Sequence, residues 1–564
     1  MKYRSNMSVA HVALAVAILA LVPAIAAAQN GVNLAGPEAA AAIDKVFATF
    51  DGTTKPGCAL GVWRDGKIIY TRGFGMANLE YNVPITPETI FEAGSVSKQF
   101  TAAAIQLLAR DEKLALADDI RKFVPEVPPF GPLITIKHLL THTSGIRDQW
   151  GLLTAAGRPP GSAVHTLDEI LDLVSRQRDL NFAPGADYLY SNTGYALMAW
   201  VVRRASGRSL ADFSMERIFR PLGMSKTQWR DDYSEIVKGR ATAYSQERDG
   251  SYHLDMSFTN VYGNGGLLTT VSELLVWAEN FWTPRVLDRA SLDEMEVPMV
   301  LNDGTPTFYG LGLNISEYKG LREVSHSGST AGYRAFLARF PAQKVAIALL
   351  SNYGGTNTSD LVHKVADILL AGSLKPNPEI QPIKVAPEEL QAKAGLYRDP
   401  KTDAILDLVV KDGRLTDNGG RGQALLCVES GRFMTAAGTR YAFETSGEKN
   451  IAVLRITAPG VAPALYSRVE PARPTPEALT EYTGFYWSDE LEVTYIAAIK
   501  DGKLTLRHRP EAAVALEPTD KDGFVSRTES GGTTLYRFTR DRRGRVDGFT
   551  VNAGRVRHLK FVKK

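Results

Sequence analysis

The chain has 564 residues, of which 44% are hydrophobic, 23% charged and 9% aromatic. These fractions are typical of a folded, water-soluble protein and exclude a collagen, a coiled coil or a mostly disordered chain. The 65 Lys and Arg against 62 Asp and Glu leave a formal charge of +3, which does not support a nucleic-acid or membrane-surface partner. The length is too great for one hydrophobic core, so we expect several domains.

The N-terminus has the layout of a secretory signal peptide. Lys2 and Arg4 precede an apolar run over residues 12–22, and three alanines at 26–28 follow it. A charged start, a short apolar stretch and small residues before a cleavage site are what such a signal requires. The run is shorter than the roughly 20 residues needed to span a bilayer, which disfavours a membrane anchor. We therefore expect residues 1–28 to be removed and the mature protein to be periplasmic or secreted, without an integral membrane span.

Residues from about 38 to 375 mix strand and helix patterns, which indicates a domain of the α/β (α+β) class. Two apolar runs separated by an Asp-Gly turn predict a β-hairpin, and apolar residues at three- and four-residue intervals predict helices. These elements, in chain order, are a hairpin of 58–63 and 67–70, a helix that begins near Ser95, and a helix over about 194–205 that ends near Gly207.

A change in composition near residue 375 predicts a linker. Pro376, Pro378, Pro382 and Pro387 punctuate a segment that fits neither a helix nor a central strand. Beyond it, three sequence blocks recur at one offset of 89 residues without a gap. They are Pro-Glu-x-Leu at 387 and 476, Gly-x-Tyr at 395 and 484, and Lys-Asp-Gly-x-Leu at 411 and 500. Alternating polarity and Asp-Gly turns in both copies predict two small all-β barrel-like domains, 376–470 and 471–564.

Metal and thiol chemistry have weak support. Cys58 and Cys427 are far apart and outside any redox motif, so we expect small buried apolar residues. His138 and His142 have the spacing of two zinc ligands on a helix, but Leu139 stands where a zinc protease has its catalytic glutamate. We expect no metal and no cofactor.

Three short motifs carry candidate catalytic chemistry. Ser95 and Lys98 lie one helical turn apart, where a lysine whose charge is disfavoured by burial beside Phe91 and Phe100 would accept the serine proton. Tyr190 can relay protons to a leaving group, and Asn192 can hydrogen-bond a substrate amide.

The third motif lies between apolar runs, as on a strand. Here His326 can donate a hydrogen bond or supply a positive charge, and Gly328 would let a substrate backbone approach closely. Each motif alone has an ordinary structural explanation.

The ordered combination of Ser-x-x-Lys, Tyr-x-Asn and His-x-Gly resembles the serine β-lactamase and penicillin-binding protein superfamily. The tyrosine is similar to that of the class C β-lactamase branch, with its D-aminopeptidases, D-alanyl-D-alanine carboxypeptidases and esterases. Stretches at 138–145, 263–267 and 332–334 also match that branch. The resemblance covers residues 38–370. It implies a β-lactamase/transpeptidase-like catalytic domain over residues 29–375, with an antiparallel sheet flanked by helices.

That resemblance implies an acyl-enzyme mechanism. Ser95 would attack a carbonyl, Lys98 and Tyr190 would share the acid and base work in an order that stays open, and Asn192 would orient the substrate amide. The backbone N–H groups of Ser95 and Ser329 would form the oxyanion hole.

The third motif departs from the class C pattern, which has Lys-Thr-Gly there. A neutral histidine holds a carboxylate less firmly than a lysine, so a β-lactamase is disfavoured. The two β domains are similar to those of D-aminopeptidases, one of which lends a loop to the active site. We expect an exported serine hydrolase that acts on peptide or amide bonds like a D-aminopeptidase or DD-carboxypeptidase. An esterase or weak β-lactamase on the same fold, and a non-catalytic binding protein, remain open, as does the oligomeric state.

Overall fold

The chain forms two units, each built from segments that are far apart in sequence. The first comprises Met1–Leu114, Met198–Val297 and Gly310–Lys375, and the second Ala115–Leu197, Pro298–Tyr309 and Pro376–Lys564. The computed structural model describes residues 30–33, 36–376, 381–418, 422–436, 438–446, 451–458, 462–508, 512–527 and 532–564. The predicted signal peptide and Pro378 of the predicted linker lie outside the described residues.

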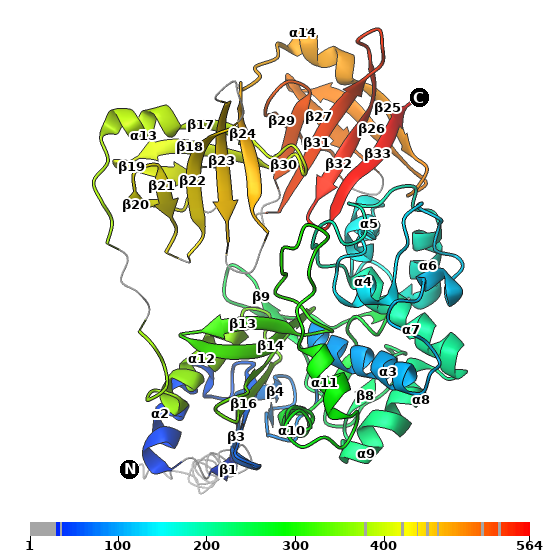
Figure 1. The fold of residues 1–564 in the computed structure, drawn as a ribbon, viewed down its shortest axis with the longest axis vertical. Coiled ribbons are helices and arrows are strands. Elements are labelled where there is room, and N and C mark those ends of the chain that lie inside the picture. Colours follow the sequence, from blue (N-terminus) through cyan, green and yellow to red (C-terminus); the bar gives the residue numbers. More distant parts are fainter. Residues whose placement is uncertain are drawn as a thin grey trace, which may run out of the picture. The chain divides into compact units, whose positions relative to one another are not determined.

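An antiparallel sheet organises the first unit, with its strands in the order β1-β3-β2-β16-β15-β14-β13 (Figure 1). Their bounds are β1 Asn30–Asn33, β2 Cys58–Arg64, β3 Lys67–Phe74, β13 Asn314–Tyr318, β14 Leu321–Thr330, β15 Tyr333–Phe340 and β16 Val345–Ser351. The early and late parts of the chain meet where β2 pairs with β16, with Cys58 opposite Ser351. The predicted hairpin is confirmed: Asp65 and Gly66 between β2 and β3 both have positive φ, as a tight hairpin turn requires.

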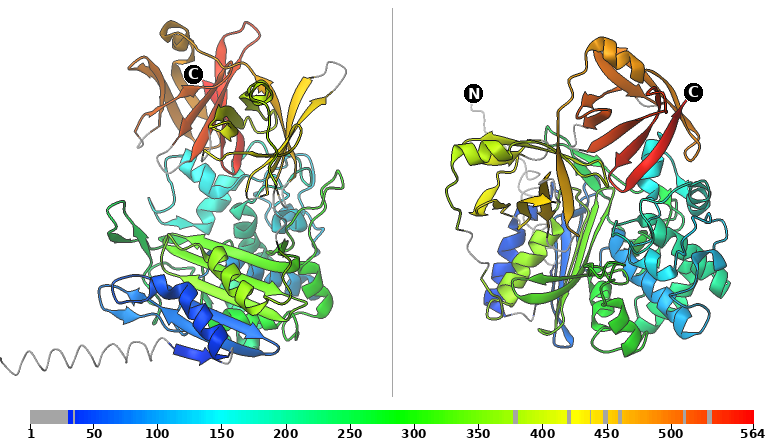
Figure 2. Two further views of the ribbon diagram at one scale, coloured as in Figure 1. Left: turned by 90° about the vertical axis from the view of Figure 1, so that its left-hand side faces the viewer. Right: turned by 45° about the horizontal axis from the view of Figure 1, so that its top comes forward.

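Helices cover both faces of this sheet. Figure 2 shows α2 (Pro37–Phe47) and α12 (Thr358–Leu369) side by side across one face, where Leu60 and Val62 join their core. Helix α10 (Val271–Glu279) covers the other face and packs so closely that a Cβ on Gly61 would lie 2.9 Å from Leu275. Double coverage explains why β2 reads as a continuous apolar run.

The predicted helix after Ser95 is confirmed. A 3₁₀ turn, η2 (Gly94–Ser97), leads directly into α3 (Lys98–Arg110), whose residues from Lys98 to Leu108 are all buried. A helix that is buried on every side is held firmly by its surroundings, which gives Ser95 and Lys98 a rigid support.

The second predicted helix is also confirmed, as α7, and Gly207 follows it with φ +75°. A glycine with positive φ is the usual end of a helix. The remaining helices are α4 Ile136–Leu140, α5 Gln149–Ala155, α6 Leu167–Ser175, α7 Asn192–Ser206, α8 Leu210–Ser214, α9 Arg220–Leu222, α11 Arg289–Met295, α13 Pro387–Lys393 and α14 Pro476–Leu479.

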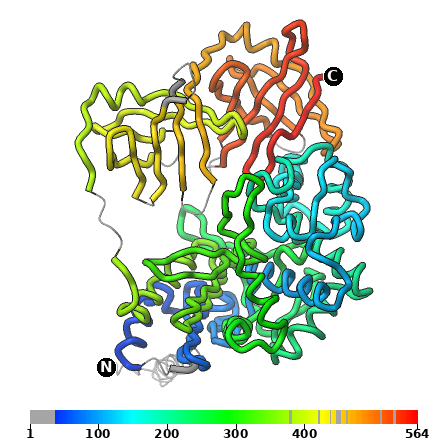
Figure 3. Tube along the Cα trace, viewed as in Figure 1, coloured from blue at the N-terminus to red at the C-terminus, as the bar shows by residue number. Residues whose placement is uncertain are grey.

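Two antiparallel sheets form the C-terminal part of the second unit, traced in yellow and in orange to red in Figure 3. The first has the strands β17 Gly395–Arg398, β18 Ile405–Lys411, β19 Arg414–Asp417, β20 Leu426–Glu429, β21 Arg432–Met434, β22 Arg440–Ser446, β23 Ile451–Thr457 and β24 Ala464–Val469. The second has β25 Gly484–Ser488, β26 Val493–Lys500, β27 Lys503–Arg507, β28 Val514–Ala515, β29 Glu517–Pro518, β30 Gly523–Arg527, β31 Thr533–Arg540, β32 Val546–Ala553 and β33 Val556–Lys563.

The two sheets repeat the same local structure at the offset seen in the sequence. Gly395 and Gly484 have φ of +144° and +140°. Two residues later, the hydroxyl groups of Tyr397 and Tyr486 each donate to the carbonyl four residues before them, at 2.9 and 2.7 Å. The predicted fold class is therefore confirmed: an α/β (α+β) domain with an antiparallel sheet flanked by helices, followed by two all-β barrel-like domains.

Both cysteines are free and buried, as expected of small apolar residues. Cys58 lies in the core of the first sheet, where burial raises the pKa of its thiol well above the usual range. Cys427 belongs to the core of the first C-terminal sheet. Among the described residues, no helix has the length and apolar character to cross a membrane.

Candidate active site

Ser95 and Lys98 are brought together at the start of α3. The Lys98 Nζ lies 3.0 Å from the Ser95 Oγ and donates to the Asn264 carbonyl at 2.6 Å. The lysine side chain is fully buried, whereas Ser95 is partly exposed. The predicted spacing of one helical turn thus produces a direct contact between a reachable hydroxyl group and a buried amine.

The segment 263–267 is bound to this helix and supplies the lysine's carbonyl partner. Thr101 Oγ1 donates to the Gly263 carbonyl at 2.7 Å, and the Leu267 N–H donates to Ser97 Oγ at 3.1 Å. These bonds fix the Asn264 carbonyl beside Lys98. The sequence marked the segment through its resemblance only, because a backbone carbonyl leaves no side-chain signal.

Strand β14 carries His326, Gly328 and Ser329, as predicted, but Gly328 has another role than expected. A Cβ on Gly328 would lie 2.0 Å from the Ala93 carbonyl oxygen, so the neighbour that needs the space is the chain's own backbone rather than a substrate. A Cβ on Gly94, in turn, would lie 2.6 Å from the Ser329 backbone nitrogen. The backbone before Ser95 and the backbone at Ser329 are therefore in close contact.

Replacing Gly328 with alanine is expected to lower kcat/KM by about 10²- to 10³-fold, because either β14 or the turn before Ser95 must move. The matched control is Gly372→Ala, since a Cβ there meets nothing within 4 Å. Initial rates on one substrate, with circular dichroism of both variants, test this expectation. Wild-type activity in a folded Gly328→Ala protein would show that the close approach is dispensable.

His326 is buried and electrically neutral. Its Nδ1–H donates to the Ser327 carbonyl at 2.6 Å, and its side chain is nearly inaccessible to solvent. Burial and the nearby Lys98 charge lower its pKa to about 3. Of the two roles considered for this residue, the lowered pKa disfavours the positive charge near neutral pH and leaves the hydrogen-bond donor.

This shift predicts how stability depends on pH. A histidine whose folded-state pKa lies below its unfolded value of 6.5 binds more protons when unfolded. The free energy of unfolding therefore decreases as pH falls below about 6.5, and His326 accounts for up to about 1.4 kcal/mol of this decrease per pH unit. Urea unfolding of wild type and His326→Gln at pH 4.5, 5.5 and 6.5 should show the smaller slope in the variant. Equal slopes of unfolding free energy against pH in the two proteins would contradict the lowered pKa of His326.

Tyr190 and Asn192 belong to the second unit, in a shell of aromatic and polar residues. The Tyr190 and His142 rings are in contact, with centroids 4.1 Å apart and planes tilted by 34°, and His142 Nδ1 accepts from the Ser191 N–H at 3.1 Å. Asn192 begins α7, and both its backbone N–H and its Nδ2 donate to Asp148 Oδ2, at 2.7 and 2.9 Å. Asp148 therefore fixes the orientation of the Asn192 amide.

Arg555 is a further residue of this second group. Its guanidinium carbon lies 4.5 Å from the centroid of the Tyr190 ring, and its Nη1 is 3.8 Å from Asp148 Oδ2. It lies in the turn between β32 and β33, far from any motif in the sequence. Asp148 and Arg555 were both missed, because neither belongs to a recognisable short pattern.

The seven predicted site residues are thus divided between the units. Ser95, Lys98, His326, Gly328 and Ser329 lie in the first, and Tyr190 and Asn192 lie in the second. Of the two histidines considered as metal ligands, His138 accepts from the Thr135 N–H at 3.2 Å and caps α4, while the His142 ring packs against the Tyr190 ring.

Comparison with known proteins identifies the family of this chain. Residues 43–372, more than half of the chain, match the Beta-lactamase family. A D-aminopeptidase of Brucella anthropi is 25% identical over 526 residues, covering 90% of this chain and 95% of its own. A D-aminopeptidase of Brucella canis is 28% identical over 378 residues, which cover 66% of this chain and 69% of the relative.

A solved structure supports the fold. The penicillin-binding protein homologue from Pyrococcus abyssi superposes with a TM-score of 0.53 at 24% identity, covering 84% of this chain and 99% of that one. Together with the serine, lysine and tyrosine motifs, the family match identifies the chemistry. The chain belongs to the β-lactamase family and is a serine hydrolase.

Proposed function

We propose that this protein is an exported serine hydrolase that cleaves peptide or amide bonds next to a D-amino acid through an acyl-enzyme. The observation that carries the proposal is the contact of 3.0 Å between the fully buried Lys98 amine and Ser95 Oγ. A lysine removed from water loses part of its preference for the charged form and becomes able to accept the serine proton.

In this mechanism each site residue has its own role. Ser95 Oγ attacks the carbonyl carbon of the substrate, and the Ser95 hydroxyl proton passes to Lys98 or to Tyr190. Tyr190 also donates a proton to the leaving amine. Asn192, oriented by Asp148, hydrogen-bonds the substrate amide. Water then hydrolyses the ester formed on Ser95.

The backbone N–H groups of Ser95 and Ser329 form the oxyanion hole in this mechanism. The close approach of Gly94 to the Ser329 nitrogen supports it, because it brings the two backbone segments to the same place. Donors of this kind stabilise the charge that develops in the transition state, typically by about 3–4 kcal/mol each.

Two observations favour amide substrates with a D-residue over β-lactams. The relatives matched over most of the chain are D-aminopeptidases. His326 is neutral and its Nδ1–H is bonded to its own backbone, so it supplies no charge for the carboxylate of a β-lactam. A DD-carboxypeptidase must also bind a carboxylate, at the C-terminus of its peptide substrate. A neutral His326 therefore favours a D-aminopeptidase over a DD-carboxypeptidase.

The test is turnover of D-alanine p-nitroanilide by the purified mature protein. L-alanine p-nitroanilide, p-nitrophenyl acetate and a β-lactam serve as comparison substrates, and Ser95→Ala as the control. The proposal expects D-selective amide cleavage that is lost in the variant. Ester cleavage alone would indicate an esterase, and activity that survives in Ser95→Ala would mean that another residue is the nucleophile.

A non-catalytic binding protein is the remaining alternative. A fluorescent acylating probe should label the wild-type protein and not Ser95→Ala. A folded wild-type protein that hydrolyses nothing and takes no label would favour the binding protein.

Export is part of the proposal and rests on residues 1–28. The mature N-terminus should be Gln29 when the protein is expressed with its own leader, and protein sequencing of the secreted or periplasmic fraction tests this. A retained residue 1 in the active protein would contradict removal of the signal.

A further inference from the structure

The turn between β32 and β33 brings a cation to Tyr190. Arg555 is half-exposed, and its guanidinium carbon lies 4.5 Å from the ring centroid of Tyr190. A guanidinium over an aromatic face is attracted by the ring, and still more strongly by a ring that carries a negative oxygen.

The turn is held firmly in this position by Asn181. The Asn181 Nδ2 donates to the Arg555 carbonyl at 3.0 Å, and the Arg557 N–H donates to Asn181 Oδ1 at 2.7 Å. Arg557 also pairs with Asp187 at 2.8 Å. Since Asn181 and Asp187 come from the same segment as Tyr190, the turn and the tyrosine are fixed to one support.

Three aromatic neighbours of Tyr190, namely His142, Tyr188 and Tyr309, do not supply a positive charge. His142 accepts a hydrogen bond through Nδ1, which requires that nitrogen to be unprotonated. Tyr309 is fully buried and Tyr188 is partly buried, and burial raises the pKa of each, so both stay neutral. Asp148 faces Arg555 at 3.8 Å, but its Oδ2 also accepts two hydrogen bonds from Asn192.

We propose that Arg555 is a positioning residue for Tyr190: its guanidinium holds the phenol ring in place, and its charge favours the proton-accepting form of the tyrosine. This inference rests on the proposed function, in which Tyr190 moves protons. It makes the second C-terminal β domain part of the catalytic mechanism rather than an independent module.

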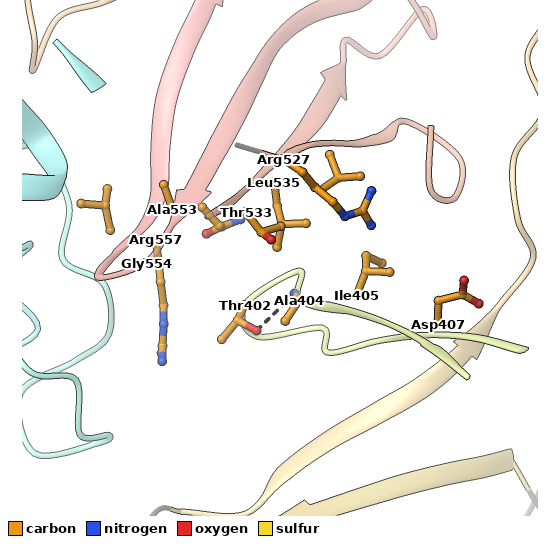
Figure 4. A pocket seen from close by; sticks show the side chains of 13 residues that line it. Thr402, Ala404, Ile405, Asp407, Arg527, Thr533, Leu535, Ala553, Gly554 and Arg557 are labelled. Carbon is orange, nitrogen blue, oxygen red and sulfur yellow. Dashed lines mark hydrogen bonds between the residues drawn. The ribbon is translucent and has the colours of Figure 1, made fainter. Parts of the chain in front are cut away.

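The test uses Arg555→Gln and Arg555→Lys in the full-length enzyme, with Arg527→Gln as the matched control. Arg527 is a similarly exposed arginine of the same sheet, and it lines a cavity of about 370 Å³ between the two β domains (Figure 4). The same cavity is bordered by Ala553 and Gly554, next to the turn, so the control changes the neighbourhood of the turn without touching Tyr190.

We expect kcat to fall about 3- to 10-fold in Arg555→Gln with KM little changed, and the ascending limb of the pH–rate profile to move up by about half a pH unit. Arg555→Lys should restore the position of that limb, because it keeps the charge. Arg527→Gln should match wild type in both measurements.

A second readout needs no substrate. Absorbance at 295 nm reports phenolate, and the difference between each protein and its Tyr190→Phe derivative isolates Tyr190. The Tyr190 signal should appear at higher pH in Arg555→Gln than in wild type.

An unchanged pH profile and an unchanged phenolate titration in a folded Arg555→Gln would overturn the inference. A rise in KM confined to substrates that carry a carboxylate would also overturn it, and would make Arg555 a substrate-binding residue. Failure of the proposed function has a different signature: activity that survives in Ser95→Ala.

Discussion

Replacing Lys98 with methionine is expected to lower kcat/KM by about 10³- to 10⁴-fold while the protein stays folded. Methionine has a similar length and suits the buried position, but it cannot accept the Ser95 proton. The side chain it replaces is fully buried and lies 3.0 Å from Ser95 Oγ. Steady-state kinetics on the best amide substrate, with calorimetry to verify folding, measure the effect.

Two further variants make this prediction specific. Lys98→Arg keeps a positive charge but cannot act as a base, because a guanidinium does not lose its proton in proteins. It should therefore fail to rescue activity. Lys364→Met removes an exposed lysine of α12 and should match wild type. More than about a tenth of wild-type activity in a folded Lys98→Arg would show that Lys98 acts as a charge and not as a base.

Among the substitutions proposed, replacing Arg147 with methionine is expected to cause the largest loss of folding stability. Arg147 is completely buried, and its Nη1 lies 2.8 Å from Glu490, which is 4% exposed. It also donates to the backbone carbonyls of Arg557 and His558 at 3.0 and 3.3 Å. Arg147→Met therefore leaves a buried carboxylate without its partner, which costs about 3–5 kcal/mol and lowers Tm by about 6–20 °C.

A double-mutant cycle separates the ion pair from the rest of the contact. Glu490→Leu alone should also destabilise the protein. The double variant Arg147→Met/Glu490→Leu should lose much less stability than the sum of the two single losses, because no unpaired charge remains. The control is Arg545→Met, which breaks an exposed pair with Asp541 and should change Tm very little. Additive losses measured by scanning calorimetry would contradict a coupled buried pair.

The buried pair also explains why the C-terminal sheet is not an isolated appendage. Arg147 lies directly before Asp148, which orients Asn192, so the contact with Glu490 supports the segment that holds Asn192 in place. A loss of activity on warming that precedes global unfolding would be the functional consequence of Arg147→Met.

Local patterns in the sequence were sufficient for the elements that bear the chemistry. The hairpin of β2 and β3, the helix that begins at Lys98 and the strand of His326 all follow from turn residues and hydrophobic periodicity. The Ser95–Lys98 contact was predictable for the same reason, because residues three apart on a helical turn face the same way. The duplicated β domains were visible as one offset of 89 residues, since each copy repeats its own local contacts.

The sequence by itself thus indicated the family, the candidate nucleophile Ser95 with Lys98 beside it, and the all-β character of the C-terminal third. Only the tertiary structure decided which backbone atoms serve these residues and what surrounds them. The Asn264 carbonyl at Lys98, the close approach of Ala93 to Gly328 and the Arg555 guanidinium at Tyr190 join positions up to hundreds of residues apart. Such contacts depend on packing between elements, and no local period or short motif records them.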